Sequence, residues 1–146
     1  MGNKKNYTIN AVSEEKFASK AMVRDHFVKT DQPETMGGSD TAPSPMELFL
    51  VSLSTCITTM AKIIAGQKQI ELRGISVEVR GEYDIDAVMG KAPDTFPGFE
   101  TIEVDIELDA DMDLEEKRIF ASEIESRCPV SNTIKKSCEI LVNVAD

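Results

Sequence analysis

Apolar and polar residues alternate along several segments of this chain, and a period of two is typical of β-strands that keep one face in water. In chain order, the alternating segments cover residues 6–12, 16–24, 27–30, 70–83, 100–108 and 138–144. The first three are joined by short turn segments and predict a three-stranded meander. The next two predict long strands, and the last predicts a strand that closes the chain.

A different pattern follows Ser44, where apolar residues recur at helical spacing as far as Gly66. Ser44 can cap this helix, Pro45 suits its first position, and Glu47 completes a capping box. Nearly every other position is apolar or small as well, so we expect the helix to be buried on most sides. In so small a protein, that burial predicts a partner subunit.

Two more helices are predicted in the C-terminal part. Asp113 can cap a helix that ends near Arg127, with Glu116 as the second member of its capping box. Pro129 can then open a short third helix, because its fixed φ suits the first helical position. Both helices precede the predicted last strand.

The order of these elements indicates the fold class. The segments 31–45 and 84–99 are rich in Pro and Gly and are interpreted as loops. Strands, helix, strands, helix, strand is an α+β order, in which antiparallel strands cover one face of each helix. With 146 residues and 41% hydrophobic content, the chain predicts a single domain over residues 1–146.

Charge and cysteine content narrow the class of protein. The net charge of −10 and the pI near 4.6 predict a surface that repels nucleic acid and anionic membranes. No stretch reaches about 18 uninterrupted apolar residues, and the start lacks the apolar run of a signal peptide. Three cysteines are an odd number, which suits a reducing compartment better than a secreted disulfide framework. We therefore expect a cytoplasmic protein.

The cysteines carry the candidate chemistry. Cys56 lies on the apolar helix, where a free cysteine usually packs as a small hydrophobic residue. Cys128 precedes a helix N-terminus, where unpaired backbone N–H groups favour a thiolate. Cys138 alternates with apolar residues and is expected in the core. No pair has the short spacing of zinc ligands, and His26, the one histidine, lies at a predicted turn, so no metal site is predicted.

Two spaced motifs resemble a known family. Residues 37–48 (Gly-Gly-Ser-Asp-Thr-Ala-Pro-Ser-Pro-Met-Glu-Leu) precede Cys56 on its helix, and Cys-Pro-Val-Ser-Asn occupies residues 128–132. The pattern resembles the OsmC/Ohr family of osmotically inducible and organic hydroperoxide resistance proteins. The resemblance implies an OsmC-like α+β fold, with curved antiparallel sheets packed on two long central helices. It also implies an intertwined homodimer with active sites at the subunit interface.

The resemblance further implies a thiol-dependent peroxidase that reduces organic hydroperoxides. Cys56 would be the peroxidatic thiolate that attacks the distal peroxide oxygen, leaving an alcohol and a sulfenic acid. Cys128 would resolve the sulfenic acid as a disulfide, and an external dithiol would reset the pair. No bound cofactor is implied.

Two charged groups of the family's site do not transfer directly. There, a glutamate ten residues before the reactive cysteine holds an arginine that orients the thiolate, and Met46 occupies that position here. Glu47 lies about 180° from Cys56 around the helix and is better explained as the capping-box acid. Residues 31–45 contain no basic side chain, so Arg24 is the nearest candidate arginine.

These departures leave two other hypotheses about the function open. One is a non-catalytic dimer that binds a small apolar or sulfur-containing ligand or senses the redox state. The other is a structural dimer with buried, inert cysteines. A guanidinium close to the Cys56 sulfur would favour the peroxidase, because it would mark an activated thiol rather than a packed one.

Overall fold

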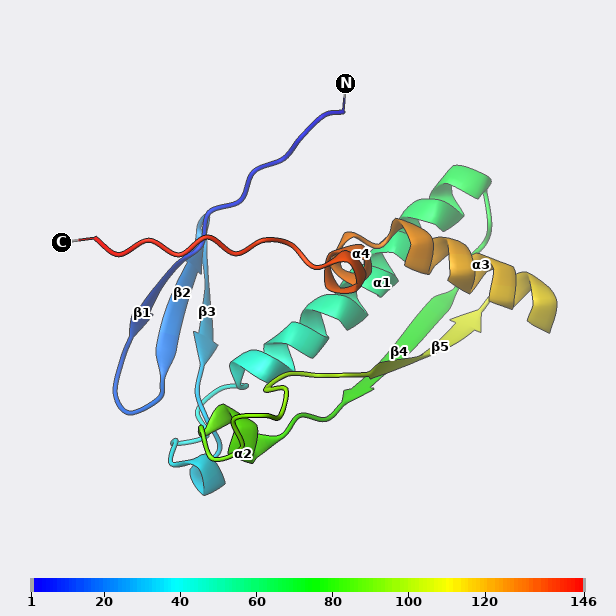
Figure 1. Ribbon diagram of the computed structural model, residues 1–146. Coiled ribbons are helices and arrows are strands. Elements are labelled where there is room, and N and C mark those ends of the chain that lie inside the picture. Colours follow the sequence, from blue (N-terminus) through cyan, green and yellow to red (C-terminus); the bar gives the residue numbers. More distant parts are fainter. Residues whose placement is uncertain (1, 146) are drawn as a thin grey trace. The chain divides into compact units, whose positions relative to one another are not determined.

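The computed structural model describes residues 2–145, which form two compact units (Figure 1). The first unit runs to Phe49 and the second begins at Leu50. The first holds three strands and a loop, and the second holds two further strands and most of the helical residues.

A three-stranded antiparallel sheet forms the body of the N-terminal unit. In order across the sheet, its strands are β1 (Asn10–Ser13), β2 (Ser19–Val23) and β3 (His26–Thr30). The predicted meander is thus confirmed. Its first strand is shorter than the predicted segment 6–12, because pairing begins at Asn10, opposite Met22.

Asp31 organises the loop that follows β3. Its carboxylate is buried and accepts hydrogen bonds from the backbone N–H groups of Gln32, Ser39 and Thr41, at 2.8, 3.3 and 3.1 Å. The Thr41 hydroxyl donates a fourth, at 2.8 Å. These bonds, led by the one from the Thr41 backbone, hold the pKa of Asp31 at about 2. The predicted loop is therefore tied to one buried anion.

Close backbone packing reinforces this loop. It contains a short 3-10 helix, η1 (Glu34–Met36), which ends at Gly37 in the left-handed region with a φ of 87°. A Cβ on Gly38 would stand 1.9 Å from the backbone oxygen of Gln32. A larger residue at position 38 would therefore push the loop apart.

The long helix α1 (Pro45–Lys68) begins where the capping residues predict. The Ser44 N–H donates to Glu47 Oε2 at 2.7 Å, and the Glu47 N–H donates to Ser44 Oγ at 3.3 Å. The helix runs two residues past Gly66 and ends before Gln69, whose φ of 56° is left-handed. The helix therefore does not end at Gly66 as predicted, because a helix interior tolerates a glycine at a cost of about 1 kcal/mol.

Only one stripe of α1 is buried by this chain. The stripe consists of Leu53, Ile57, Ala61, Ile64 and Ala65. Elsewhere on the helix Val51 is 47% exposed and Ile63 is 44% exposed. The prediction of burial on most sides is therefore wrong for the single chain, because the described elements of the second unit bury only this stripe.

In length and composition α1 also matches a membrane span, with a mean hydropathy of 1.8 over 18 residues. Core helices of other proteins satisfy the same criteria, so the match by itself is weak evidence for a span. The buried stripe of α1 packs against strands and helices of the second unit.

The second unit contains an antiparallel pair, β4 (Gly74–Gly81) and β5 (Ile102–Asp109), with Val77 opposite Ile106. The two predicted long strands are confirmed, although β4 is shorter than the segment 70–83. The connection between them contains a four-residue helix, α2 (Ile85–Val88), that its composition did not predict. Asp84 caps this helix by accepting the Ala87 N–H at 2.8 Å.

The two C-terminal helices are α3 (Leu114–Arg127) and α4 (Pro129–Lys136), and both were predicted. The capping box of α3 is complete, with 2.8 Å bonds between Asp113 and Glu116 in both directions. The hydrophobic core of the unit joins the stripe of α1 to β5 and α3, which lie beside α1 in Figure 1. Besides that stripe, its buried members are Leu108, Phe120, Ile124 and Cys128.

The predicted last strand is absent from the described residues. The chain is extended beyond α4 but pairs with no strand, and Ile140, Leu141 and Val142 are 81%, 76% and 82% exposed. Cys138, expected in the core, is exposed. Both predictions are wrong for the single chain, because a strand forms only against a partner edge, and within residues 2–145 the segment pairs with none.

We predict that Asp31 makes the stability of the N-terminal unit depend on acid pH. Its pKa in the folded protein, about 2, lies below the ordinary value of 3.8. The stabilisation is therefore complete above the ordinary value and is lost as the pH falls toward 2. Asp31→Asn should lower the thermal midpoint by several degrees at pH 7 and flatten its dependence between pH 5 and 2. Asp40→Asn, an exposed change in the same loop, should do neither.

Candidate functional site

Two elements of the second unit bring Cys56 and Cys128 together. Cys56 lies on α1 directly before Ile57, at the edge of the buried stripe. Cys128 lies between α3 and α4, where it ends one helix and caps the next. Its sulfur accepts the Ser131 N–H at 3.5 Å. The corner between the two helices thus presents a thiol to the face of α1.

The sulfurs of Cys56 and Cys128 are 3.1 Å apart, with the Cys128 thiol donating to the Cys56 sulfur. Both are free thiols. Cys128 is fully buried, whereas Cys56 is half-buried. The pair therefore combines one sulfur that a reagent can reach with a second that is poised for disulfide formation.

Burial is the main influence on the Cys56 thiol. It raises the pKa of Cys56, and the hydrogen bond and charge interaction with Cys128 raise it further. A hydrogen bond from the Val130 backbone N–H acts in the opposite direction. Val130 and Ser131 belong to the first turn of α4, so the helix N-terminus faces both sulfurs. Backbone amides are thus the groups that favour a thiolate here.

Within residues 2–145, no cationic side chain contributes to the pKa of Cys56. Four of the arginines pair with nearby carboxylates, namely Arg73, Arg80, Arg118 and Arg127. Among the described residues of the second unit, 50–145, no guanidinium therefore acts on the Cys56 thiol.

The two charged residues named from the sequence lie in the N-terminal unit. The carboxylate of Glu47 accepts the Ser44 N–H, which confirms its role in the capping box. Arg24 is exposed at the turn between β2 and β3, with a left-handed φ of 55°. Catalytic roles for Glu47 and Arg24 stay predictions.

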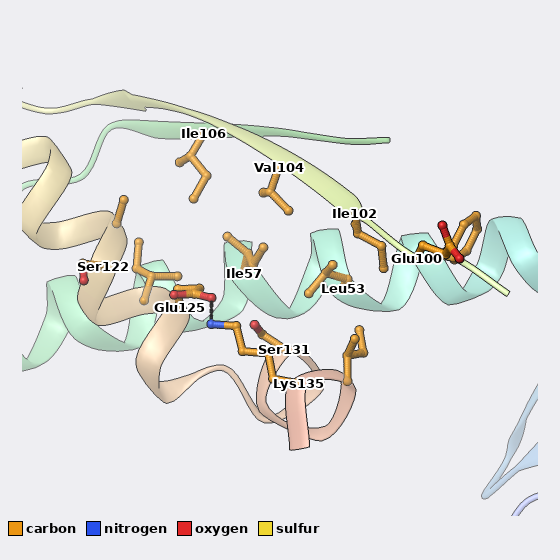
Figure 2. A pocket seen from close by; sticks show the side chains of 14 residues that line it. Leu53, Ile57, Glu100, Ile102, Val104, Ile106, Ser122, Glu125, Ser131 and Lys135 are labelled. Atoms are coloured by element: carbon orange, nitrogen blue, oxygen red, sulfur yellow. Dashed lines mark hydrogen bonds and ion pairs between the residues drawn. The ribbon is translucent and has the colours of Figure 1, made fainter. Parts of the chain in front are cut away.

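An apolar groove of about 570 Å³ is lined in part by Ile57, the residue after Cys56, and by Ser131, whose N–H bonds the Cys128 sulfur (Figure 2). Its walls are Leu53 and Ile57 of α1 and the side chains of Ile102, Val104 and Ile106 on β5. Its polar rim comprises Glu100, Ser122, Glu125, Ser131 and Lys135, with Lys135 and Glu125 ion-paired across α4 and α3. The sequence did not predict this groove, although alternation along β5 marked the side chains that line one wall.

Comparison with known protein families and solved structures agrees with the α+β fold described above. The sequence profile of the family described as OsmC-like protein matches residues 37–143, well over half of the chain. The chain belongs to the OsmC-like protein family. None of the curated proteins searched matches this sequence. The family assignment therefore rests on the sequence profile, and the solved structures test the fold.

Several solved structures share the OsmC-like fold. The OsmC-like protein from Mycoplasma pneumoniae matches with a TM-score of 0.79 and 22% identity, covering 92% of this chain and 91% of that one. An organic hydroperoxide resistance protein OsmC from Legionella pneumophila matches with a TM-score of 0.69 and 16% identity, covering 92% of each chain. An organic hydroperoxide resistance protein from Vibrio cholerae, with captopril bound in one active site, matches with a TM-score of 0.65 and 19% identity. The match covers 94% of this chain and 89% of that one. At these identities the likeness establishes the α+β fold.

We predict a fixed order of thiol reactivity in the native protein. Iodoacetamide should label half-buried Cys56 slowly and should reach buried Cys128 only after unfolding. Because the pKa of Cys56 is raised, its labelling rate should keep increasing above pH 8.5, where a free thiol begins to level off. Cys128→Ala removes two of the causes that raise the pKa and should shift the Cys56 profile to lower pH. Peptide mass spectrometry across pH 7–10 measures both effects, and fast labelling of native Cys128 would contradict them.

Proposed function

We propose that this protein is a thiol-dependent peroxidase that reduces organic hydroperoxides in the cytoplasm. The observation that carries the proposal is the 3.1 Å approach of the two free thiols, one reachable and one buried. Membership of the OsmC-like family supports a redox role, and structural relatives are described as organic hydroperoxide resistance proteins.

The proposed reaction proceeds in three balanced steps. The Cys56 thiolate attacks the distal peroxide oxygen, the O–O bond breaks, and a proton completes the alcohol, which leaves a sulfenic acid on Cys56. The Cys128 thiol then displaces the sulfenic oxygen as water, forming the disulfide. An external dithiol reduces this disulfide by two exchange steps, becomes oxidised itself and returns both thiols.

The groove offers a place for the organic part of the peroxide. Its walls are apolar, and Ile57 directly follows Cys56 on α1. Binding there removes the apolar surface of an alkyl or aryl group from water, which favours the binding of organic hydroperoxides over hydrogen peroxide.

We also propose that the working form is the intertwined homodimer. The chain exposes 11376 Å², whereas a folded monomer of 16.1 kDa exposes about 7,400 Å². The excess of about 4,000 Å² per chain makes about 8,000 Å² for two copies, which is more than the roughly 2,000–5,000 Å² that obligate homodimers commonly bury in total. Much of it is apolar, on α1 and along the extended C-terminal segment. A second copy is the partner that supplies complementary strand edges without another gene product.

A second function is favoured by one observation, the raised pKa of Cys56 without a nearby guanidinium. A thiol that is mostly protonated reacts slowly with peroxide. The same pair would then serve as a redox sensor, or as part of a ligand-binding dimer, without rapid turnover. The two functions differ in their rate with peroxide.

We predict that the protein consumes cumene hydroperoxide in the presence of excess dithiol. Cys56→Ser should lower the rate on the order of a hundredfold or more. Without dithiol, Cys128→Ser should consume one equivalent and stop, with one added oxygen on Cys56 by mass spectrometry. Cys138→Ser, a change at the exposed third thiol, should leave turnover intact.

The same assay separates the alternatives. Peroxide that decays no faster than with Cys56→Ser would leave only the sensor or ligand-binding function. The predicted roles of Arg24 and Glu47 can be tested alongside, since Arg24→Gln should slow the first step only if Arg24 orients the peroxide. Glu47→Gln should lower stability, through the capping box, more than activity.

We predict that the C-terminal segment contributes to dimer stability. Val142→Asp, which places a charge on an 82% exposed valine, should raise the dimer dissociation constant at least about tenfold, because a buried charge is costly. Asn143→Asp adds the same charge at the neighbouring position, on the opposite face of a strand, and should have a smaller effect. Sedimentation equilibrium measures the constant. A wild-type protein that stays monomeric at high micromolar concentration would contradict the homodimer.

A further inference from the structure

The side chain of Asn132 links α3 and α4 at the corner between them. Its amide nitrogen lies 2.8 Å from the Cys128 carbonyl oxygen, 3.0 Å from that of Ser126 and 3.5 Å from that of Glu125. The carbonyls of Ser126 and Glu125 belong to the last turn of α3, and the Glu125 carbonyl also accepts the Cys128 N–H at 3.3 Å. Asn132 therefore ties the first turn of α4 to the last turn of α3.

The geometry of this corner decides where the sulfurs meet backbone amides. Cys128 lies between the two helices, and Pro129, the next residue, has no N–H. The first amides of α4 are therefore those of Val130 and Ser131. One interacts with the Cys56 sulfur and the other with the Cys128 sulfur. A rotation of α4 relative to α3 would move both amides away from the pair.

One other side-chain interaction crosses the corner, the ion pair between Lys135 and Glu125. Both side chains are about half exposed, at 59% and 47%, and exposed ion pairs of this kind contribute little. The short Asn132 side chain loses less conformational freedom on bonding than lysine and glutamate side chains do. Its bond to Cys128 is partly shielded from water, and its bonds to Ser126 and Glu125 are exposed. Asn132 is therefore the stronger constraint on the orientation of α4.

We propose that Asn132 is a positioning residue for the thiol pair, because it holds the first turn of α4 so that its backbone N–H groups face both sulfurs. In this chain those amides replace a cationic side chain as the groups that favour the thiolate. The inference rests on the proposed thiol chemistry of Cys56 and Cys128. It does not require that peroxide be the oxidant.

The test uses the full-length protein with Cys138→Ser, which leaves the pair as the only thiols. Asn132→Ala removes the amide, and Asn132→Asp keeps its shape but replaces the donor with an acceptor. Thr133→Val is the matched control, because it removes the Thr133 hydroxyl bond to the Pro129 carbonyl, which lies within α4 and does not cross the corner. Circular dichroism and thermal melting confirm that each variant is folded.

Two measurements report on the sulfurs directly. The first is the pH profile of Cys56 alkylation. The second is the rate of disulfide formation with oxidised glutathione, in which the Cys56 thiolate expels one glutathione thiolate and Cys128 then expels the other. Both Asn132 variants should shift the alkylation profile to higher pH and slow disulfide formation by about tenfold to a hundredfold. Thr133→Val should change neither.

The outcomes separate this inference from the proposed function. Folded Asn132→Ala and Asn132→Asp proteins with the parent profile and rate would overturn the positioning role. If Asn132→Ala does not fold, Asn132→Leu decides, because it keeps the size of the side chain, lacks the donor and adds no charge near the sulfurs. If glutathione forms the disulfide but cumene hydroperoxide is not consumed, the peroxidase proposal fails, and the Asn132 comparison still decides the positioning role.

Discussion

The chemistry of this chain depends on the contact between the α3–α4 corner and α1. Cys128 is a member of the hydrophobic core, and its sulfur reaches Cys56 at the edge of the buried stripe of α1. The apolar burial that stabilises the second unit therefore also sets the distance between the two reactive atoms. Packing and reactivity are coupled here, since a shift of α3 against α1 would change both.

The same burial has an electrostatic consequence. It raises the pKa of Cys56, because a charged sulfur loses solvation in an apolar environment. In an acidic protein whose arginines mostly pair with carboxylates, the N-terminus of α4 supplies the positive pole near the sulfurs. The capping of that helix is thus a chemical feature as well as a structural one. This relation links a local motif, Cys-Pro-Val-Ser-Asn, to the behaviour of a residue on a different helix.

The uncovered apolar surface has one physical origin. The elements of a single chain bury only one stripe of α1, leave the C-terminal segment unpaired and leave the groove beside β5 open. A sequence that alternates apolar residues over 138–144 has β-propensity, but a strand also requires hydrogen-bonding partners along its backbone. The proposed dimer would supply such partners. The errors in predicting the last strand, the burial of Cys138 and the burial of α1 share this cause.

Interactions within about one helical turn or one hairpin were predictable from the sequence. The capping boxes at Ser44 and Asp113 and the proline that opens α4 are of this kind, because their partners lie close in the chain. The alternation along β4 and β5 was also predictable, because it is a pattern within each strand, although the residues that pair lie 21 to 35 positions apart. The four-residue α2 is too short for periodicity to reveal. The sequence by itself determined the elements and named the two thiols. Only the tertiary structure decided that sulfurs 72 residues apart lie within 3.1 Å, because that distance follows from the packing of whole helices, which no local pattern encodes.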